Sequence, residues 1–199
     1  MKIALTGGIA CGKSLVARFL RELGFAVLDA DDVVHELEAP GGAAIPAIAS
    51  VFGREALSPD GGVDRARLAQ TVFADASARR SLEAILHPLV RARMLAFAAG
   101  TDVVSRVSVI PLLFESHWET DYDTILCVSS ATETQIGRMM QTRGYTRVQA
   151  EARLAAQMPV AEKAARADWT IHNDSTKQQL KAEVQRCVAW LVGRMEKAI

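Results

Sequence analysis

Eight residues near the start of the chain, 7–14 (GGIACGKS), have the spacing GxxxxGK[ST]. Glycines let a backbone turn with positive φ and approach a ligand closely, and the N–H groups of such a loop, ahead of a helix N-terminus, can point at one anion. Lys13 is then placed to reach the β- and γ-phosphates of a nucleotide, and the Ser14 hydroxyl to bind Mg²⁺. We therefore interpret residues 7–14 as a phosphate-binding loop. The residues expected to contact the nucleotide from this loop are Gly8, Ala10, Cys11, Gly12, Lys13, Ser14 and Leu15.

The alternative is a glycine-rich turn that matches the spacing by chance. An apolar run at 3–5 precedes the loop and a helical pattern at 12–23 follows it, which is the context that a phosphate-binding loop requires. Cys11 is interpreted as a small residue in a tight loop, although a helix N-terminus can lower the pKa of a thiol. Such a loop alone does not distinguish a kinase from a GTPase or a motor ATPase. The chain has no guanine-reading NKxD stretch, and the run IPLLFE (110–115) stands where an Mg²⁺-ordering aspartate is usual.

A second group of chemically useful side chains, Asp29, Asp31 and Asp32, follows an apolar run at 25–28. Ligands of open α/β sheets bind beyond the carboxyl ends of the strands, so we expect Asp29 and Asp31 to face the nucleotide. Asp31 is the expected catalytic carboxylate, which orients an acceptor hydroxyl and takes its proton. Asp29 is expected to be an orienting residue or a cap of the following helix. The alternative is that all three residues cap a helix at 33–38. His35 lies four residues after Asp31, on the same helical face, and could touch substrate.

Apolar runs and turn residues indicate which elements position these side chains. The chain opens strand, loop, helix, strand, which favours a parallel sheet covered by helices. The residue before Pro88, His87, is expected to have an extended backbone. Breaks are expected near Gly144 and Pro159 in the helical stretch 132–165. We predict one α/β domain without repeats or linkers. Expected strands are 3–5, 25–28, 103–110, 124–128 and 169–171, and expected helical regions are 12–23, most of 30–100, 132–165 and 175–198.

Composition excludes several classes of protein. The 199 residues include 23 Lys and Arg and 23 Asp and Glu, so the net charge is zero, and half of the residues are apolar. A disordered chain would have fewer apolar residues and a large net charge, and a polycationic nucleic-acid binder would have a large positive charge, so both classes are excluded. No apolar run is long enough to span a membrane, and the start of the chain is a poor signal peptide. Three scattered cysteines favour reduced thiols in the cytoplasm over disulfides or a zinc site.

Beyond these motifs the sequence resembles the dephospho-CoA kinase family over almost its whole length. The blocks that carry the resemblance are LTGGIACGKS (5–14), DADDVVHEL (29–37), GG (41–42), FG (52–53), DGGVDRARL (60–68), VF (72–73), LEAILHP (82–88), PLLFE (111–115), Gln135 with Arg138, AAQMP (155–159), AD (167–168) and Asn173. The resemblance implies a three-layer P-loop NTPase fold with a five-stranded parallel sheet. It also implies one kinase domain made of a core (about 1–32, 101–132 and 161–199), a helical CoA-binding region (about 33–100) and a lid (about 133–160).

The resemblance further implies the reaction, transfer of the γ-phosphoryl group of ATP to the ribose 3′-hydroxyl of dephospho-CoA, and residue roles. Asp31 would be the catalytic carboxylate, and His35, Arg65, His87 and Glu115 would line the acceptor side. Arg65 could clamp a phosphate bidentately; its alternative is an ordinary surface arginine. For His87 the alternative is packing at a helix junction, and for Glu115 a cap of the next turn. Asn173 would lie near the adenine of ATP, or only shape the turn before the last helix.

The lid departs from the family pattern, in which two arginines stand four residues apart. Here Arg138 is followed by Arg143 five residues later, and Thr142 stands at the expected position. One residue rotates a side chain by about 100° around a helix. Arg143 could still reach the phosphates if the helix ends just before Gly144; otherwise Arg138 alone serves the lid. Leu15 stands where the family commonly has Thr, and we expect little effect.

Three functions follow in order of preference: a dephospho-CoA kinase, a kinase of another alcohol such as a nucleoside or a shikimate-like compound, and a nucleotide-binding regulator that transfers nothing. The expected partners are ATP and dephospho-CoA with Mg²⁺, and neither nucleic acid nor a membrane. A monomer or weak homo-oligomer is expected.

Overall fold

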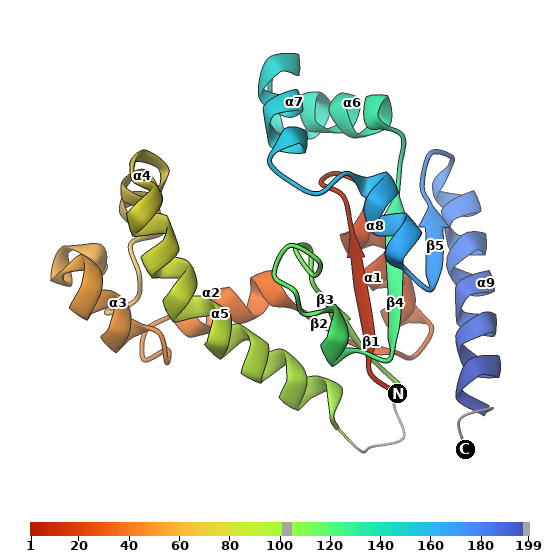
Figure 1. Ribbon diagram of the computed structural model, residues 1–199, viewed down its shortest axis with the longest axis horizontal. Helices are drawn as coiled ribbons and strands as arrows, with labels where there is room; N and C mark the ends of the chain where they lie inside the picture. The colour runs from red at the N-terminus through yellow and green to blue at the C-terminus, as the bar shows by residue number, and fades with distance from the viewer. Residues whose placement is uncertain (101–104, 197–199) are drawn as a thin grey trace. The chain divides into compact units, whose positions relative to one another are not determined.

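Five short apolar segments of the chain form one sheet. The computed structural model describes residues 1–100 and 105–196. The strand order is β2-β3-β1-β4-β5, so β1, which precedes the phosphate-binding loop, is central. Its neighbours β3 and β4 run parallel to it, and β5 runs parallel to β4. The predicted five-stranded parallel sheet is confirmed (Figure 1). The strands are β1 (Ile3–Gly7), β2 (Ala26–Asp29), β3 (Arg106–Val109), β4 (Thr124–Ser129) and β5 (Trp169–His172).

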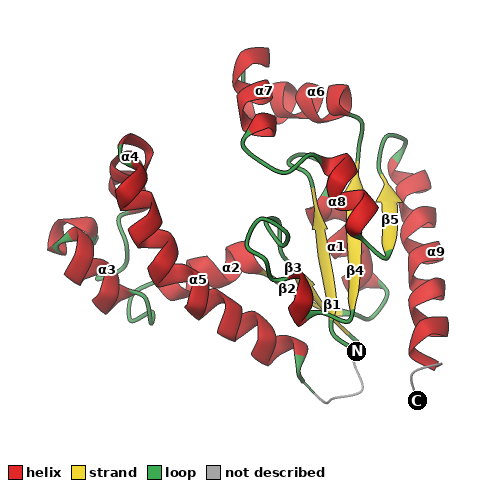
Figure 2. Cartoon of the chain, in the orientation of Figure 1, coloured by secondary structure: helices red, strands yellow, loops and turns green. Residues whose placement is uncertain are grey.

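Helices provide the rest of the regular structure (Figure 2). The helical stretch after β4 is broken at Gly144, which has a left-handed backbone, and again before α8, as predicted. Residues 103–104 of the predicted third strand and 197–198 of the predicted last helix lie outside the described residues. The helices are α1 (Lys13–Glu22), α2 (Ala30–Glu38), α3 (Ile45–Phe52), α4 (Arg65–Ala74), α5 (Ala76–Ala98), α6 (Thr132–Arg143), α7 (Arg147–Ala155), α8 (Val160–Arg166) and α9 (Lys177–Glu196), with short 3₁₀ turns η1 (Arg54–Ala56) and η2 (Glu119–Asp121).

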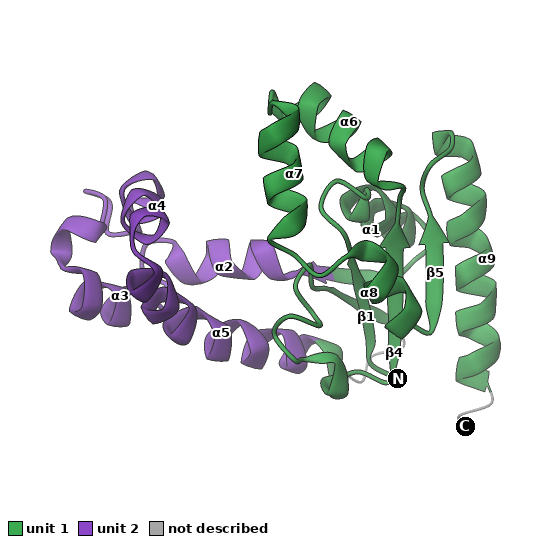
Figure 3. Ribbon diagram, turned by 45° about the horizontal axis from the view of Figure 1, so that its top comes forward, with its two compact units in different colours: residues 1–27, 98–199 green, residues 28–97 purple. Residues whose placement is uncertain are grey.

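The chain divides into two compact units, residues 1–27 with 98–199 and residues 28–97 (Figure 3). In the first unit, apolar side chains of α1 and α9 pack with the sheet strands in one core, and α8 contacts β1 and β4. In the second unit, α3, α4 and α5 surround a smaller core around Ile48 and Leu68. The phosphate-binding loop therefore stands on the sheet unit, and the acidic and histidine residues of 29–87 on the helical unit.

The expectation for His87 is wrong. His87 and Pro88 lie inside the 23-residue helix α5 and not in an extended segment. Proline removes one helical hydrogen bond and disfavours a helical residue before it. The helix continues because Leu86, Val90 and Met94, spaced four residues apart, are all buried along one face. Burial of that face outweighs the local preference of the His-Pro pair.

The helix after the acidic cluster begins earlier than predicted. α2 begins at Ala30, not at Val33, so Asp31 lies in its first turn. Asp29 is the N-cap: its side chain accepts the Asp31 N–H at 3.0 Å, as the capping interpretation predicted. Asp31 and Asp32 are both exposed in the first turn, where the helix dipole favours negative charge.

Candidate active site

The phosphate-binding loop has the backbone conformation that its sequence predicts. Gly12 is the N-cap of α1 with a left-handed backbone (φ 92°), and a side chain there would clash with Asn173 Nδ2. Ala10 also has a positive φ, 57°. A left-handed turn directly before a helix places several backbone N–H groups around one point. The loop is thus shaped for an anion.

Lys13 and Ser14 begin the helix behind the loop. Lys13 Nζ donates to the carbonyls of Gly7 at 3.0 Å and of Gly8 at 2.9 Å, so the amine lies against the loop backbone. Ser14 is exposed, which leaves its hydroxyl accessible to a ligand. Leu15 is half-buried and packs against the core of the sheet unit. Lys13 and Ser14 are therefore the side chains of this turn that can reach a polyphosphate.

Three consecutive carbonyls of the loop are bound by side chains from distant elements. Gln135 Nε2 donates to Ile9 O at 2.6 Å, Arg138 Nη1 to Ala10 O at 3.2 Å, and Asn173 Nδ2 to Cys11 O at 2.8 Å. Gln135 and Asn173 are buried. Hydrogen bonds to successive carbonyls fix the peptide planes, so the N–H groups of the loop are oriented before a ligand arrives. Sequence reasoning did not predict this arrangement, because the bonded residues are more than 120 positions apart.

Arg138 and Arg143, the two arginines of α6, have different surroundings. The guanidinium of Arg138 also donates to Ser130 Oγ at 3.1 Å and to Asn173 O at 2.7 Å, so it is held beside the loop. Arg143 is the last residue of α6 and is exposed, and its side chain forms no hydrogen bond or ion pair with the rest of the described chain. Thr142 Oγ1 donates to Arg138 O at 2.7 Å, inside the helix. The structure thus ends the helix directly after Arg143, which is the condition under which Arg143 could reach phosphates.

Cys11 is buried within the loop, and this burial raises the pKa of its thiol, although the nearby Lys13 acts in the opposite direction. A thiol with a raised pKa is poorly nucleophilic at neutral pH. Burial also raises the pKa of Cys127, to about 12. The raised pKa of Cys11 agrees with its interpretation as a small residue in a tight loop and not as a reactive thiol.

The helical unit carries Asp31, His35, Arg65 and His87. Arg65 Nε pairs with Glu38 Oε2 at 2.9 Å, and its Nη2 donates to His35 O at 3.3 Å. Glu38 is buried, whereas about half of the Arg65 side chain is exposed. Arg65 is therefore held on one side by α2 and keeps a face toward solvent. Sequence reasoning missed Glu38, because a glutamate at the end of a helix resembles a solvated residue.

Glu115 lies in the sheet unit, after β3, and does not cap the next turn. Its Oε1 pairs with Lys163 Nζ at 2.7 Å and accepts the Met158 N–H at 3.1 Å. Lys163 is fully buried. Sequence reasoning missed Lys163 as well, since a lysine in a charged helix is usually exposed.

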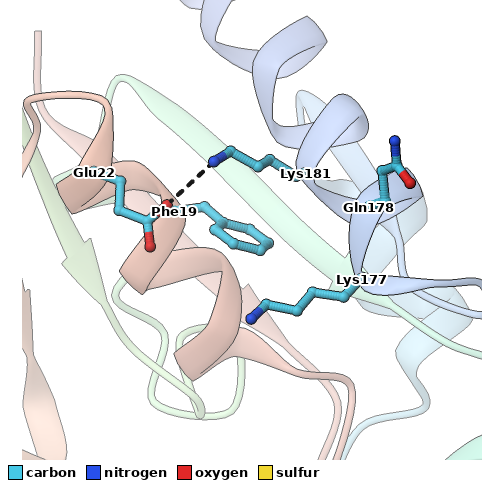
Figure 4. A pocket seen from close by; sticks show the side chains of 5 residues that line it. All are labelled: Phe19, Glu22, Lys177, Gln178 and Lys181. Atoms are coloured by element: carbon cyan, nitrogen blue, oxygen red, sulfur yellow. Dashed lines mark hydrogen bonds and ion pairs between the residues drawn. The ribbon is translucent and has the colours of Figure 1, made fainter.

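The structure also has a pocket lined by Phe19 and Glu22 of α1 and by Lys177, Gln178 and Lys181 of α9 (Figure 4). Lys181 Nζ lies 3.5 Å from Glu22 Oε2 across it. None of the predicted site residues lines this pocket. Over residues 1–100 and 105–196 there is no group of three or more His, Cys, Asp or Glu side chains that could hold a metal. No helix in the same ranges is long and apolar enough to cross a membrane.

Comparisons with protein-family models and with curated proteins point to the same family. The family model described as dephospho-CoA kinase matches residues 1–179. The dephospho-CoA kinase of Symbiobacterium thermophilum is 44% identical over 191 residues, covering 94% of this chain and 79% of the relative. That of Geobacter sulfurreducens is 43% identical over 186 residues, covering 92% and 94%.

Solved structures agree with the sequence comparison. Dephospho-CoA kinase from Campylobacter jejuni superimposes with a TM-score of 0.68 at 25% identity, covering 94% of this chain and 95% of that one. The protein TT1252 from Thermus thermophilus gives a TM-score of 0.79 at 33% identity, covering 96% of both chains. Shikimate kinase from Acinetobacter baumannii (TM-score 0.54, 19% identity, 96% and 93% covered) shares the fold.

Proposed function

The chain belongs to the dephospho-CoA kinase family, and from this premise we propose that it transfers the γ-phosphoryl group of ATP to the ribose 3′-hydroxyl of dephospho-CoA, giving CoA and ADP. The observation that carries the proposal is the family match over residues 1–179, which includes the phosphate-binding loop and the whole helical unit. A shared fold alone would not distinguish this acceptor from another alcohol.

ATP is held by the phosphate-binding loop in this proposal. The backbone N–H groups of Gly8 to Ser14 surround the β-phosphate, and Lys13 exchanges its bonds to the Gly7 and Gly8 carbonyls for phosphate oxygens. The side-chain bonds to Ile9, Ala10 and Cys11 keep the loop in shape, so little ordering is needed on binding. Asn173, which binds the loop, lies near the adenine.

A magnesium ion fits the oxygen donors of this site. Mg²⁺ at phosphoryl-transfer sites is held by one or two protein oxygens together with phosphate oxygens and water. Ser14 offers an exposed hydroxyl in the turn that follows the loop. When bound with ATP, Mg²⁺ neutralises charge on the β- and γ-phosphates.

Asp31 acts on the acceptor. Its carboxylate accepts the hydrogen bond of the 3′-hydroxyl and takes the proton as the new bond to the γ-phosphorus forms and the bond to ADP breaks. The Asp29 cap fixes the backbone at Asp31 through its N–H, which limits the positions of the carboxylate. Since phosphoryl transfer needs little covalent help, positioning of this kind supplies much of the rate.

The remaining roles divide between the two units. His35, His87 and Glu115 contact the acceptor, and the exposed face of Arg65 binds a phosphate of dephospho-CoA. Arg138 and Arg143 neutralise charge on the transferred group from the lid. We place the reaction in the cytoplasm, to which three free, buried cysteines are suited, with the protein acting as a monomer or weak homo-oligomer and without nucleic acid or a membrane.

The test is incubation of the purified protein with Mg-ATP and dephospho-CoA, with CoA detected by mass and ADP by a coupled assay. We expect CoA and ADP in equal amounts. Asp31→Asn should lose at least about 100-fold in kcat and keep its KM for ATP, because it loses proton transfer but not the nucleotide site. Lys13→Ala should lower kcat and also raise the KM for ATP.

Asp32→Asn is the matched control, since Asp32 is the exposed neighbour of Asp31 in the same helical turn, and it should retain full activity. A panel of other alcohols, including a nucleoside and shikimate, is assayed in parallel. Turnover of one of those in place of dephospho-CoA would reject the acceptor, and tight ATP binding without any transfer would reject the kinase.

A further inference from the structure

Lys163 in α8 is buried to 0% exposure, which is unusual for a lysine. Its Nζ pairs with Glu115 Oε1 at 2.7 Å and donates to the carbonyl of Pro111 at 2.9 Å. Replacing a buried ion pair by apolar side chains of similar volume is often neutral or stabilising. Stability alone therefore does not explain why this core position holds a charged pair.

Glu115 is bound on one side only. Oε1 receives both the Lys163 ammonium and the Met158 N–H, the latter at 3.1 Å. Oε2 is buried and has no hydrogen-bond partner among the residues that the structure describes. A buried carboxylate oxygen without a donor costs free energy, and a ligand that donates a hydrogen bond there removes that cost. The Glu115 side chain as a whole is 24% exposed, although Oε2 itself is shielded from solvent.

The contacts of Lys163 also join three segments of the sheet unit. The Pro111 carbonyl that it binds accepts a second hydrogen bond, from Thr6 Oγ1 at 3.3 Å. Thr6 directly precedes the phosphate-binding loop, and Met158 lies between α7 and α8. Lys163 thus holds Glu115 against elements that are themselves fixed to the sheet.

We propose that Lys163 is a positioning residue, which holds the Glu115 carboxylate through Oε1 so that Oε2 accepts a hydrogen bond from a hydroxyl or N–H group of the acceptor. The inference rests on the proposed function, in which Glu115 contacts dephospho-CoA. Lys163 itself does not touch the substrate. Its loss acts through Glu115 and therefore on binding of the acceptor more than on binding of ATP.

The test is a double-mutant cycle with Lys163→Met, Glu115→Gln and the double variant. KM and kcat are measured for each substrate, together with the thermal midpoint. Each single variant should raise KM for dephospho-CoA about tenfold, the weight of one hydrogen bond to a charged group, and change KM for ATP less than twofold. The double variant should match Glu115→Gln, because the two residues act as one unit. Lys181→Met, at an exposed lysine of α9 paired with Glu22, is the matched control and should leave all constants unchanged.

The double variant keeps the test decisive if Lys163→Met alone fails to fold, because it buries no uncompensated carboxylate. A double variant whose KM for dephospho-CoA matches that of Glu115→Gln supports the proposal. A roughly hundredfold increase, or an equal rise in both KM values, shows that Lys163 acts independently of Glu115 and overturns it. If Glu115→Gln leaves KM unchanged while the wild type makes CoA, the positioning role falls and the kinase assignment stands. If the wild type makes no CoA, both fall.

Discussion

Arg138 and Arg143 differ in how many of their guanidinium donors are already bound within the described chain. The guanidinium of Arg138 donates hydrogen bonds to the loop carbonyl of Ala10, to Ser130 Oγ and to Asn173 O. These hydrogen bonds stabilise the phosphate-binding loop and leave Arg138 with fewer donors for a phosphate. Arg143 has no such bonds in the described chain and ends its helix before Gly144. We therefore propose Arg143, whose guanidinium has no partner in the described chain, as the arginine that neutralises charge on the transferred group.

Replacing Arg143 by Ala should lower kcat about 100-fold or more, since a transition-state arginine supplies large rate factors. The KM for ATP should change little, because the loop and Lys13 remain. Steady-state kinetics with Mg-ATP and dephospho-CoA measure both. Adding Thr142→Arg to Arg143→Ala moves the arginine to the position that is usual in the family and should recover part of the lost rate.

Arg186→Ala removes an exposed arginine of α9 that pairs with Glu183 and serves as the control, with unchanged kcat. If Arg143→Ala keeps the wild-type kcat, Arg138 alone serves the lid and the exposed guanidinium of Arg143 has no catalytic part.

At the scale of elements, the parts that sequence could predict are those specified locally. Glycines, Lys13 and Ser14 stand within eight residues of one another, and the loop conformation follows from them. The five strands and the breaks after α6 and α7 were predicted from apolar runs, Gly144 and Pro159. Asn173, Gln135 and Lys163 bind groups far away in the chain, and no spacing in the sequence indicates such contacts.

Helix α5 shows the converse, a local signal overruled by packing. Pro88 is exposed, and it lies within a helix whose buried side is formed by residues such as Val90 and Met94. The proline cannot donate to the carbonyl of Ala84 one turn earlier, and its ring crowds that carbonyl. No burial at Pro88 itself offsets this cost. The helix therefore carries a local defect that burial elsewhere along it outweighs.

Pro88→Ala should increase the free energy of unfolding by about 1–3 kcal/mol, because it restores one helical hydrogen bond and relieves the crowding. Urea denaturation followed by circular dichroism measures the change. Arg80→Ala, at an exposed position of the same helix, is the control and should stay within about 0.5 kcal/mol of the wild type. A loss of stability in Pro88→Ala would mean that the proline shapes the helix in a way the rest of its unit requires.

At the scale of the whole molecule, chemistry and packing divide between the two compact units. The sheet unit carries the phosphate-binding loop, helices α6 and α7 and the Glu115–Lys163 pair, while the helical unit carries Asp31, the Arg65–Glu38 pair and His87. From the sequence, Asp31 was expected in the core (about 1–32) and the helical region from about residue 33, whereas the helical unit begins at Leu28 and includes Asp31. The pairs that hold Arg65 and Glu115 were not predicted, because Glu38 and Lys163 resemble solvated charges in a sequence and become buried only when the elements pack.

Burial also makes stability of the whole fold depend on pH in the alkaline range. Cys187 of α9 is buried in the core of the sheet unit, and burial, with a smaller contribution from Glu183, raises the pKa of its thiol from 9.0 to about 12. In the unfolded chain the thiol loses its proton near pH 9, whereas the folded protein keeps it until about pH 12. Unfolding therefore releases a proton above pH 9, and stability decreases as pH rises through that window.

Cys187→Ala should remove the part of the pH dependence of stability that comes from the Cys187 thiol. Between pH 8 and pH 10 the wild type should lose about 1.4 kcal/mol more unfolding free energy than the variant, which is the cost of about one pH unit of titration above pH 9. Urea denaturation at pH 8, 9 and 10 in the presence of a reductant measures the difference. Val184→Ala, also buried on α9, creates a cavity without removing a titratable group, so its curve should run parallel to the wild type. Parallel curves for Cys187→Ala as well would show that this thiol titrates alike in the folded and unfolded chains, and that burial in the core does not control it.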